Sequence, residues 1–254
     1  MRSADRLNAY GVDLARIHHE GHDELARRAG PAVVACLRQA GIPSGLVVDL
    51  GCGSGILAKH LVERGYKVVG ADPSAAMLRI ARRTAPAARF IRSRAEDFEL
   101  PRCAAVLATG EALTYLAAGA APAAHLRRHI RRVSDALVAG GLFIFDAIEA
   151  SDSRPMTYRT WRADRDWAVM ADVTEDVRRH VVWRRITTFT RTGSRFRRSQ
   201  AEHRVGVYAR GDVLGQLRAR GFAARTLPGY GGLPMPPRRV VFHAQLRDLP
   251  VQDR

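Results

Sequence analysis

The sequence lacks several features that would place the chain in a special class. No apolar run reaches the roughly 18 residues of a membrane-spanning helix, and the first six residues lack the apolar core of a secretory signal. Only three cysteines occur, Cys36, Cys52 and Cys103, and their spacing suits neither a disulfide framework nor a zinc site. We therefore expect a cytoplasmic protein with no membrane partner and no bound metal.

Lysine is also scarce, because only Lys59 and Lys67 occur among the 41 basic residues. The net charge of +16 therefore rests on arginine, which together with abundant alanine is typical of a GC-rich coding bias. Such a charge is compatible with nucleic-acid binding. The arginines are scattered along the chain, however, and no nucleic-acid-binding module is present. We expect a small-molecule partner and keep RNA or DNA as the alternative.

Strand and helix patterns alternate between residues 46 and 145. The strands are nearly continuous apolar runs, which is typical of a parallel sheet covered by helices on both faces. The sequence thus predicts an α/β fold with a doubly wound, mainly parallel sheet of about seven strands. The expected strands are residues 46–50, 67–71, 88–91, 104–108 and 142–145, and the expected helices are residues 56–64, 75–83 and 122–138, the last ended by Gly140-Gly141.

The residues before this core have a helical pattern. Asp23 is a candidate N-cap for a helix over residues 24–29, which Gly30 ends, and Pro31 opens a second helix over residues 32–40. We expect residues 1–45 to form an N-terminal helical cap and residues 46–150 to form the core.

The residues after the core change character. Three β-branched and aromatic segments and the turn Thr192-Gly193-Ser194 predict an antiparallel β insertion over residues 151–210. A helix capped by Asp212 and two final strands then complete the core sheet within residues 211–254. The predicted strands of the insertion are residues 168–173, 181–189 and 203–208, and those that follow the helix are residues 222–227 and 240–246.

The most informative motif lies between the first predicted strand and the first core helix. The strand ends near Asp49, and Gly51, Gly53 and Gly55 then alternate with small residues. A buried strand that turns through glycines into a helix brings backbone close to a nucleotide-like ligand. A dinucleotide site needs Gly-x-Gly-x-x-Gly, and Ile56 stands where the third glycine would be. No P-loop occurs either, so a nicotinamide oxidoreductase is the least favoured enzyme.

The segment Asp49-Leu50-Gly51-Cys52-Gly53-Ser54-Gly55 resembles the first motif of class I S-adenosylmethionine-dependent methyltransferases, of the small-molecule, Rossmann-like type. Three further segments are similar to this family and follow in the same order. Asp72 ends the second strand, residues 94–98 follow the third, and residues 109–115 follow the fourth. A carboxylate after the second strand suits the ribose hydroxyls in Rossmann-like sites.

The resemblance implies a set of cofactor contacts. Asp49 would face the cationic amino group, Asp72 the ribose and Asp97 the adenine amine. Residues 10–21 resemble the helical segment that closes over the cofactor in this family. The implied cofactor-binding residues are Tyr10, His18, Asp49, Gly51, Cys52, Gly53, Gly55, Asp72, Pro73, Met77, Ala95, Glu96, Asp97, Phe98, Thr109 and Gly110.

The resulting hypothesis is methyl transfer from S-adenosylmethionine to a small molecule, leaving S-adenosylhomocysteine. An oxygen or nitrogen acceptor can need a general base, and the candidates are Glu111, His18, His19 and Tyr115. Two alternatives stay open at this point. One is an RNA or DNA methyltransferase that uses the arginine-rich C-terminal part, and the other is a non-catalytic sensor that binds the cofactor. The sequence does not identify the acceptor or the oligomeric state.

Overall fold

A computed structural model describes residues 10–21, 24–151 and 154–247. Within these ranges the chain forms one large sheet, six helices and a small two-stranded sheet. The helices are α1 (Val12–Gly21), α2 (Glu24–Gln39), α3 (Ile56–Val62), α4 (Ala75–Thr84), α5 (Pro122–Ala136) and α6 (Arg210–Ala219). The strands are β1 (Leu46–Leu50), β2 (Lys67–Asp72), β3 (Arg89–Arg92), β4 (Cys103–Ala108), β5 (Leu137–Glu149), β6 (Thr157–Ala163), β7 (Trp167–Asp176), β8 (Val181–Thr192), β9 (Arg195–Tyr208), β10 (Phe222–Leu227), β11 (Gly229–Tyr230), β12 (Leu233–Pro234) and β13 (Arg239–Leu246).

The core sheet has seven strands in the order β3-β2-β1-β4-β5-β13-β10. The first five are parallel to their neighbours, whereas β13 is antiparallel to both β5 and β10. The expected doubly wound, mainly parallel sheet of about seven strands is therefore confirmed, and its last strand in the chain, β13, runs in the opposite direction. In such a sheet the carboxyl ends of the parallel strands form one edge, and ligands bind in the crevice outside that edge.

Alternate residues of each core strand pack against opposite layers of helices. Val47 and Leu107 belong to the hydrophobic cluster of α2, α3 and α4, whereas Val48 and Val106 belong to the cluster of α5 and α6. Helices therefore cover both faces of the sheet and exclude water from them, which explains why the strands show no alternation of apolar and polar residues.

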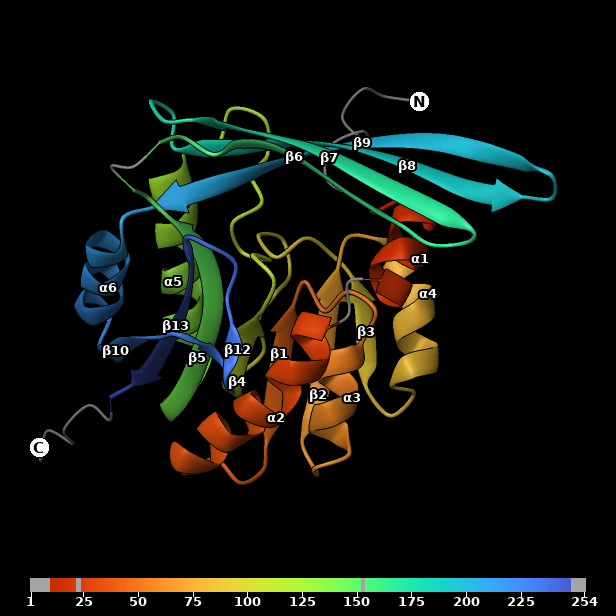
Figure 1. Cartoon of the computed structure of the whole chain (residues 1–254). Helices are drawn as coiled ribbons and strands as arrows, with labels where there is room; N and C mark the ends of the chain where they lie inside the picture. Colours follow the sequence, from red (N-terminus) through yellow and green to blue (C-terminus); the bar gives the residue numbers. More distant parts are fainter. Residues whose placement is uncertain (1–9, 22–23, 152–153, 248–254) are drawn as a thin grey trace, which may run out of the picture.

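The insertion forms four antiparallel strands, β6 to β9, which spread over the carboxyl-end side of the core (Figure 1). Strand β5 connects the two parts, because its last residues, Ile148 and Glu149, pair with Val207 and Tyr208 of β9. The predicted turn at residues 192–194 does join β8 to β9. The inserted sheet, as we call β6–β9, thus covers the edge at which ligands are expected.

Four local predictions are wrong. Gly30 and Pro31 lie inside one continuous helix, α2. A Cβ atom at Gly30 would lie 2.5 Å from the His60 ring, so this glycine serves close packing of α2 on α3 rather than helix termination. Helix α5 ends at Ala136 because Leu137 already pairs with Cys103, which makes β5 longer than predicted.

The other two errors concern the C-terminal half. Asp212 lies in the first turn of α6, and the N-cap is Ala209, without a side-chain cap. Strand β6 was not predicted because it is an edge strand whose seven residues are all exposed, so it lacks the apolar alternation of a half-buried strand. Asp23, the predicted N-cap, lies outside the described residues. None of the helices described is long and apolar enough to cross a membrane.

Candidate functional site

The glycine loop between β1 and α3 has the conformation that its sequence requires. Gly51 and Gly55 have φ values of +71° and +78°, which other residues rarely adopt. Packing adds a second constraint. A Cβ atom at Gly51 would lie 2.4 Å from the Ala112 Cβ, and one at Gly55 would lie 3.0 Å from Ala81. The first glycine therefore brings the loop close to the segment after β4, and the last brings α3 close to α4.

This loop borders a cleft at the carboxyl edge of the sheet. Two adjoining hollows form this cleft and share His18, Gly51, Gly53, Thr109 and Gly110. Ligand sites commonly lie in concave clefts of this kind, at the switch point of an α/β sheet. The predicted residues that line the cleft are Tyr10, His18, Asp49, Gly51, Cys52, Gly53, Asp72, Pro73, Met77, Ala95, Glu96, Thr109, Gly110 and Tyr115.

Asp49 and Asp72 are two buried carboxyl groups at this cleft, at the ends of neighbouring strands. Asp72 accepts hydrogen bonds from the backbone N–H of Gly53 (3.1 Å) and Ser74 (2.8 Å). Burial and the nearby Asp72 raise the pKa of Asp49 to about 8, and burial raises the pKa of Asp72 to about 6. One Asp49 oxygen is buried and has no hydrogen-bond partner among residues 10–21, 24–151 and 154–247. These acids have the properties of groups that receive donors from a ligand.

The N-terminal segment that contains Tyr10 and His18 packs beside the same cleft. Ser74, the N-cap of α4, donates a hydrogen bond from its hydroxyl to the backbone carbonyl of Tyr10 at 2.6 Å. The Tyr10 ring contacts His18 edge-on, with ring centroids 5.2 Å apart, and its hydroxyl lies 3.5 Å from that of Tyr115. Residues from three distant parts of the sequence thus meet above the glycine loop.

His203, on β9, completes this aromatic group. Its ring lies 5.3 Å from Tyr10 and 5.2 Å from Tyr115, measured between centroids. Burial and the nearby Arg184 lower the pKa of His203 to about 4, so the imidazole is neutral at pH 7. The inserted sheet therefore contributes a neutral, buried histidine directly behind the tyrosines of the cleft.

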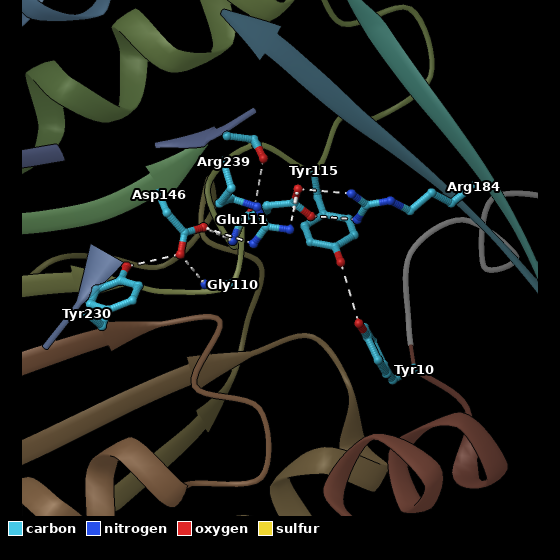
Figure 2. A network of polar contacts seen from close by, with 9 residues as sticks. Tyr10, Gly110, Glu111, Tyr115, Asp146, Arg184, Tyr230 and Arg239 are labelled. Carbon is cyan, nitrogen blue, oxygen red and sulfur yellow. Dashed lines mark hydrogen bonds and ion pairs between the residues drawn. The ribbon is translucent and has the colours of Figure 1, made fainter. Parts of the chain in front are cut away.

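Glu111 has a different environment from the one expected of a proton acceptor. Its carboxylate is 2% exposed and binds Arg184 of β8 through two hydrogen bonds of 2.5 and 2.9 Å. Arg239 of β13 lies 2.7 Å from it on the other side (Figure 2). Burial alone would raise the pKa of Glu111, but the two guanidinium groups outweigh burial and hold it below its ordinary value. Glu111 is therefore ionised and fully engaged.

Asp146, at the carboxyl end of β5, fixes the backbone of the same segment. It accepts hydrogen bonds from the N–H groups of Gly110 (2.9 Å) and Glu111 (2.5 Å), and from the Tyr230 hydroxyl (3.0 Å) (Figure 2). Arg239 also approaches it at 3.4 Å. Asp146 and Arg239 thus hold the segment after β4 on the side away from the cleft.

Five predicted residues do not line the cleft. Glu111 lies behind it, and Gly55 packs against Ala81. His19 is not among the residues that line the cleft. Residues 94–98 form a turn in which the N–H groups of Asp97 and Phe98 bond to the Arg94 carbonyl. This turn directs Glu96 to the cleft, Asp97 to solvent and Phe98 into the core.

The sequence reasoning missed four polar residues of the site: Asp146, Arg184, His203 and Arg239. Asp146 had a usable signal, because it is an acid at the end of an apolar strand, as Asp49 is. The two arginines had none among so many others, and their partners lie far away in the sequence. Within the described residues, no group of three or more histidine, cysteine or acidic side chains could hold a metal ion.

The comparisons with known proteins agree with this geometry. Residues 47–141 match the family described as a methyltransferase domain. The resemblance to class I S-adenosylmethionine-dependent methyltransferases is therefore confirmed for the segment that carries the glycine loop and β1 to β4.

Two curated relatives match somewhat more of the chain. One is a malonyl-[acyl-carrier protein] O-methyltransferase of Enterobacter lignolyticus (strain SCF1), 29% identical over 58% of this chain and 55% of that protein. The other is a ubiquinone biosynthesis O-methyltransferase of Methylobacterium sp. (strain 4-46), 32% identical over 56% of this chain and 53% of that protein. The matches span about half the length of these relatives.

Solved structures share the fold over nearly the whole chain. An S-adenosylmethionine-dependent methyltransferase from Clostridium acetobutylicum ATCC 824 has a TM-score of 0.74 at 18% identity, covering 92% of this chain and 98% of that one. CalS10, an amino pentose methyltransferase from Micromonospora echinaspora, has a TM-score of 0.73 at 19% identity, covering 94% and 98%. Its structure contains bound S-adenosylmethionine. The Rossmann-like methyltransferase fold therefore includes the inserted sheet.

Proposed function

We propose that this protein transfers a methyl group from S-adenosylmethionine to a small-molecule acceptor. The observation that carries the proposal is the pair Asp49 and Asp72, two buried acids beside a glycine loop that form no ion pair among the residues described. Such acids suit a ligand that brings its own donors: an ammonium group for Asp49 and a ribose diol for Asp72.

The cleft offers a place for each part of this cofactor. Gly51 and Gly53 present backbone without side chains, and Asp49, Cys52, Thr109 and Gly110 surround the hollow suited to the amino-acid part. Pro73, Met77, Ala95 and Glu96 line the hollow suited to the adenosine part. In place of Asp97, we propose Glu96 as the acid nearest the adenine, because it lines the cleft and Asp97 is exposed.

Tyr10, His18 and Tyr115 line the cleft on the side of the inserted sheet, and we propose that they contact the acceptor. Bound S-adenosylmethionine supplies the methyl group as an electrophile, so the residues mainly have to hold the acceptor in line and exclude water. Such positioning can account for roughly 7–11 kcal/mol of a reaction barrier. We propose that residues 151–210, the antiparallel insertion, form the cap on the acceptor side of the cleft.

If the acceptor must lose a proton, His18 is the candidate base that lines the cleft. Tyr115 also lines it, but burial raises its pKa despite the nearby Arg184, so its phenol holds its proton at neutral pH. Glu111 is bound to two arginines and His19 is not part of the lining, which makes both weaker candidates.

A small-molecule acceptor is supported by the relatives, which include O-methyltransferases and an amino pentose methyltransferase. The nucleic-acid alternative gains no support from the arginines of the insertion. Several are already bound to acids, as in the pairs Arg159–Asp172 (2.6 Å) and Arg191–Asp166 (2.8 Å). The proposal keeps a reducing, cytoplasmic location, which suits the three free cysteines.

The first test is cofactor binding by titration calorimetry. The protein is expected to bind S-adenosylmethionine and S-adenosylhomocysteine, and Asp72→Ala should weaken both by about 100-fold or more, since two charge-assisted hydrogen bonds are lost. Asp97→Ala is the matched control, an acid outside the lining, and should change affinity by less than about twofold. Unchanged affinity of Asp72→Ala would overturn the assignment of the ribose site.

A second measurement separates the enzyme from a non-catalytic sensor. A membrane first separates a cell extract into a filtrate of small molecules and a retained fraction of macromolecules. The protein is then incubated with methyl-labelled S-adenosylmethionine and each fraction in turn. Transfer of label to a small molecule is expected. Cofactor binding without transfer to either the small or the retained fraction would favour the sensor, and transfer to retained RNA or DNA would favour the nucleic-acid alternative.

A further inference from the structure

The segment after β4 carries unusual backbone strain. Gly110 and Glu111 both have positive φ values, +74° and +66°. Glycine adopts this conformation readily, but glutamate does so rarely. Strained residues of this kind persist only where surrounding contacts determine them, and they concentrate at functional sites. Gly110 lines the cleft and Glu111 stands directly behind it.

The contacts that determine this strain come from both parts of the molecule. Asp146 binds the two N–H groups from the core side, as described above. The Glu111 side chain extends the other way, to Arg184 on the inserted sheet. Arg184 and His203 are register partners on neighbouring strands, so they share the face of that sheet which covers the cleft. The Tyr115 ring lies beside the ion pair (Figure 2).

The backbone joins the same two parts a few residues later. Leu116 donates its N–H to the Arg204 carbonyl, and Gly206 donates its N–H to the Thr114 carbonyl, both at 2.8 Å. The inserted sheet is therefore attached to residues 111–116 by one buried ion pair and by strand-like hydrogen bonds. Of these, only the ion pair reaches the residue next to the cleft-lining Gly110.

We propose that Glu111 is a positioning residue for methyl transfer, because its ion pair with Arg184 sets the distance between the acceptor-facing inserted sheet and the loop that borders the cofactor. This inference rests on the proposed function. It predicts that occupation of the cofactor cleft is transmitted to β8 through Glu111. A carboxylate held between two guanidinium groups has little freedom to move alone, so a shift of Gly110 moves Arg184.

Hydrogen exchange measured by mass spectrometry tests the connection, with S-adenosylhomocysteine as the ligand. Binding should slow amide exchange in residues 109–115 and also in β8. Glu111→Gln should keep the effect in residues 109–115 and lose it in β8, with an affinity reduced by about tenfold or less. If Glu111→Gln does not fold, Arg184→Lys serves instead, since Glu111 then retains Arg239.

A matched control exists in the same molecule. Glu175 of β7 and Arg238 form a buried bidentate pair, with distances of 2.7 and 2.8 Å, that also joins the inserted sheet to the core but lies outside the lining of the cleft. Glu175→Gln should keep the ligand effect in β8. A merely structural role for Glu111 would make the two variants behave alike.

The outcomes separate the two proposals. If the unsubstituted protein does not bind S-adenosylhomocysteine, the proposed function fails. If it binds but β8 is unaffected, or if Glu111→Gln retains the effect in β8, the positioning role is overturned. An affinity loss above about 100-fold in Glu111→Gln would also overturn it, because Glu111 would then be a direct cofactor ligand.

Discussion

Two pairs of acids lie at the carboxyl edge of the core sheet, and they differ in their partners. Asp49 and Asp72 form no ion pair within the part of the chain that the structure describes, and burial raises both pKa values. Glu111 and Asp146 are also buried, but Arg184 binds Glu111, and Arg239 contacts both acids. Burial still raises the pKa of Asp146 despite Arg239. Buried charge must be neutralised in one of two ways, by proton uptake or by a counter-charge. The first pair is suited to the donors of the proposed cofactor, whereas the second pair has arginine partners within the protein.

The largest expected effect is a loss of stability when Glu111, a member of the second pair, is replaced. Glu111→Ala leaves two arginines without their main partner, and loss of one partner of a buried ion pair typically costs about 3–5 kcal/mol. Asp49→Asn removes an acid that must take up a proton on folding at neutral pH, so it should raise the free energy of unfolding or at least not lower it. Urea denaturation followed by circular dichroism measures both. Equal destabilisation by the two substitutions would contradict the distinction between the pairs.

The next effect is a dependence of cofactor affinity on pH, which the first pair should cause. In the free protein Asp49 holds a proton below pH about 8 and Asp72 below pH about 6. A cofactor with an ammonium group favours the carboxylate forms, so binding releases protons and strengthens as pH rises. Affinity should fall by up to about tenfold for each pH unit from pH 8 down to pH 6.

Calorimetry in buffers of different protonation enthalpy measures this proton release directly. Asp49→Asn should abolish the dependence between pH 8 and 6.5 and leave only the step that belongs to Asp72. An affinity that stays constant over this range in the unsubstituted protein would show that Asp49 is already ionised, and the contrast between the two pairs would then be smaller than proposed.

The smallest effect sharpens the comparison with an ion pair in which the acid is buried and the arginine is exposed. Asp13 of α1 accepts hydrogen bonds from Thr190, Ser199 and Arg197 of the inserted sheet, the last with a side chain 56% exposed. Asp13→Asn should cost about 1 kcal/mol or less, because solvent screens such pairs. The midpoint of urea denaturation is the measurement, and a loss as large as that of Glu111→Ala would contradict the importance of burial.

The sequence predicted the core better than the insertion, for a physical reason. Strands buried on both faces, such as β1 and β4, must be apolar throughout, and that pattern is local and easily recognised. Strand β6 lies at an exposed edge, so neither face selects apolar residues. The Gly30-Pro31 pair in α2 was misread because the packing that accommodates it involves His60, which no local pattern reveals.

The candidate site divides in the same way. Asp49 and Asp72, two acids that follow apolar strands, were recognised, since the topology of a parallel sheet brings them to one edge. Asp146 carries the same signal at the end of β5 and was missed. The ion pairs of Glu111 were not predicted, because Arg184 and Arg239 lie 73 and 128 residues further along the chain. Both Glu96 and Asp97 were expected at the cofactor, with Asp97 at the adenine amine. Only Glu96 lines the cleft, and a sequence alone does not give the phase of the turn at residues 94–98.

The position of β13 has a consequence for synthesis of the chain. This strand lies between β5 and β10, so the inner edge of β5 stays open until residues 239–246 have left the ribosome. Chains are made from the N-terminus at roughly 5–20 residues per second, and unpaired apolar strand edges promote aggregation meanwhile. Arg239 begins β13, so the second arginine partner of Glu111, which also contacts Asp146, is made with the same strand. The gap between β5 and β10 therefore closes, and the contacts of Arg239 with Glu111 and Asp146 form, only after residues 239–246 have been synthesised.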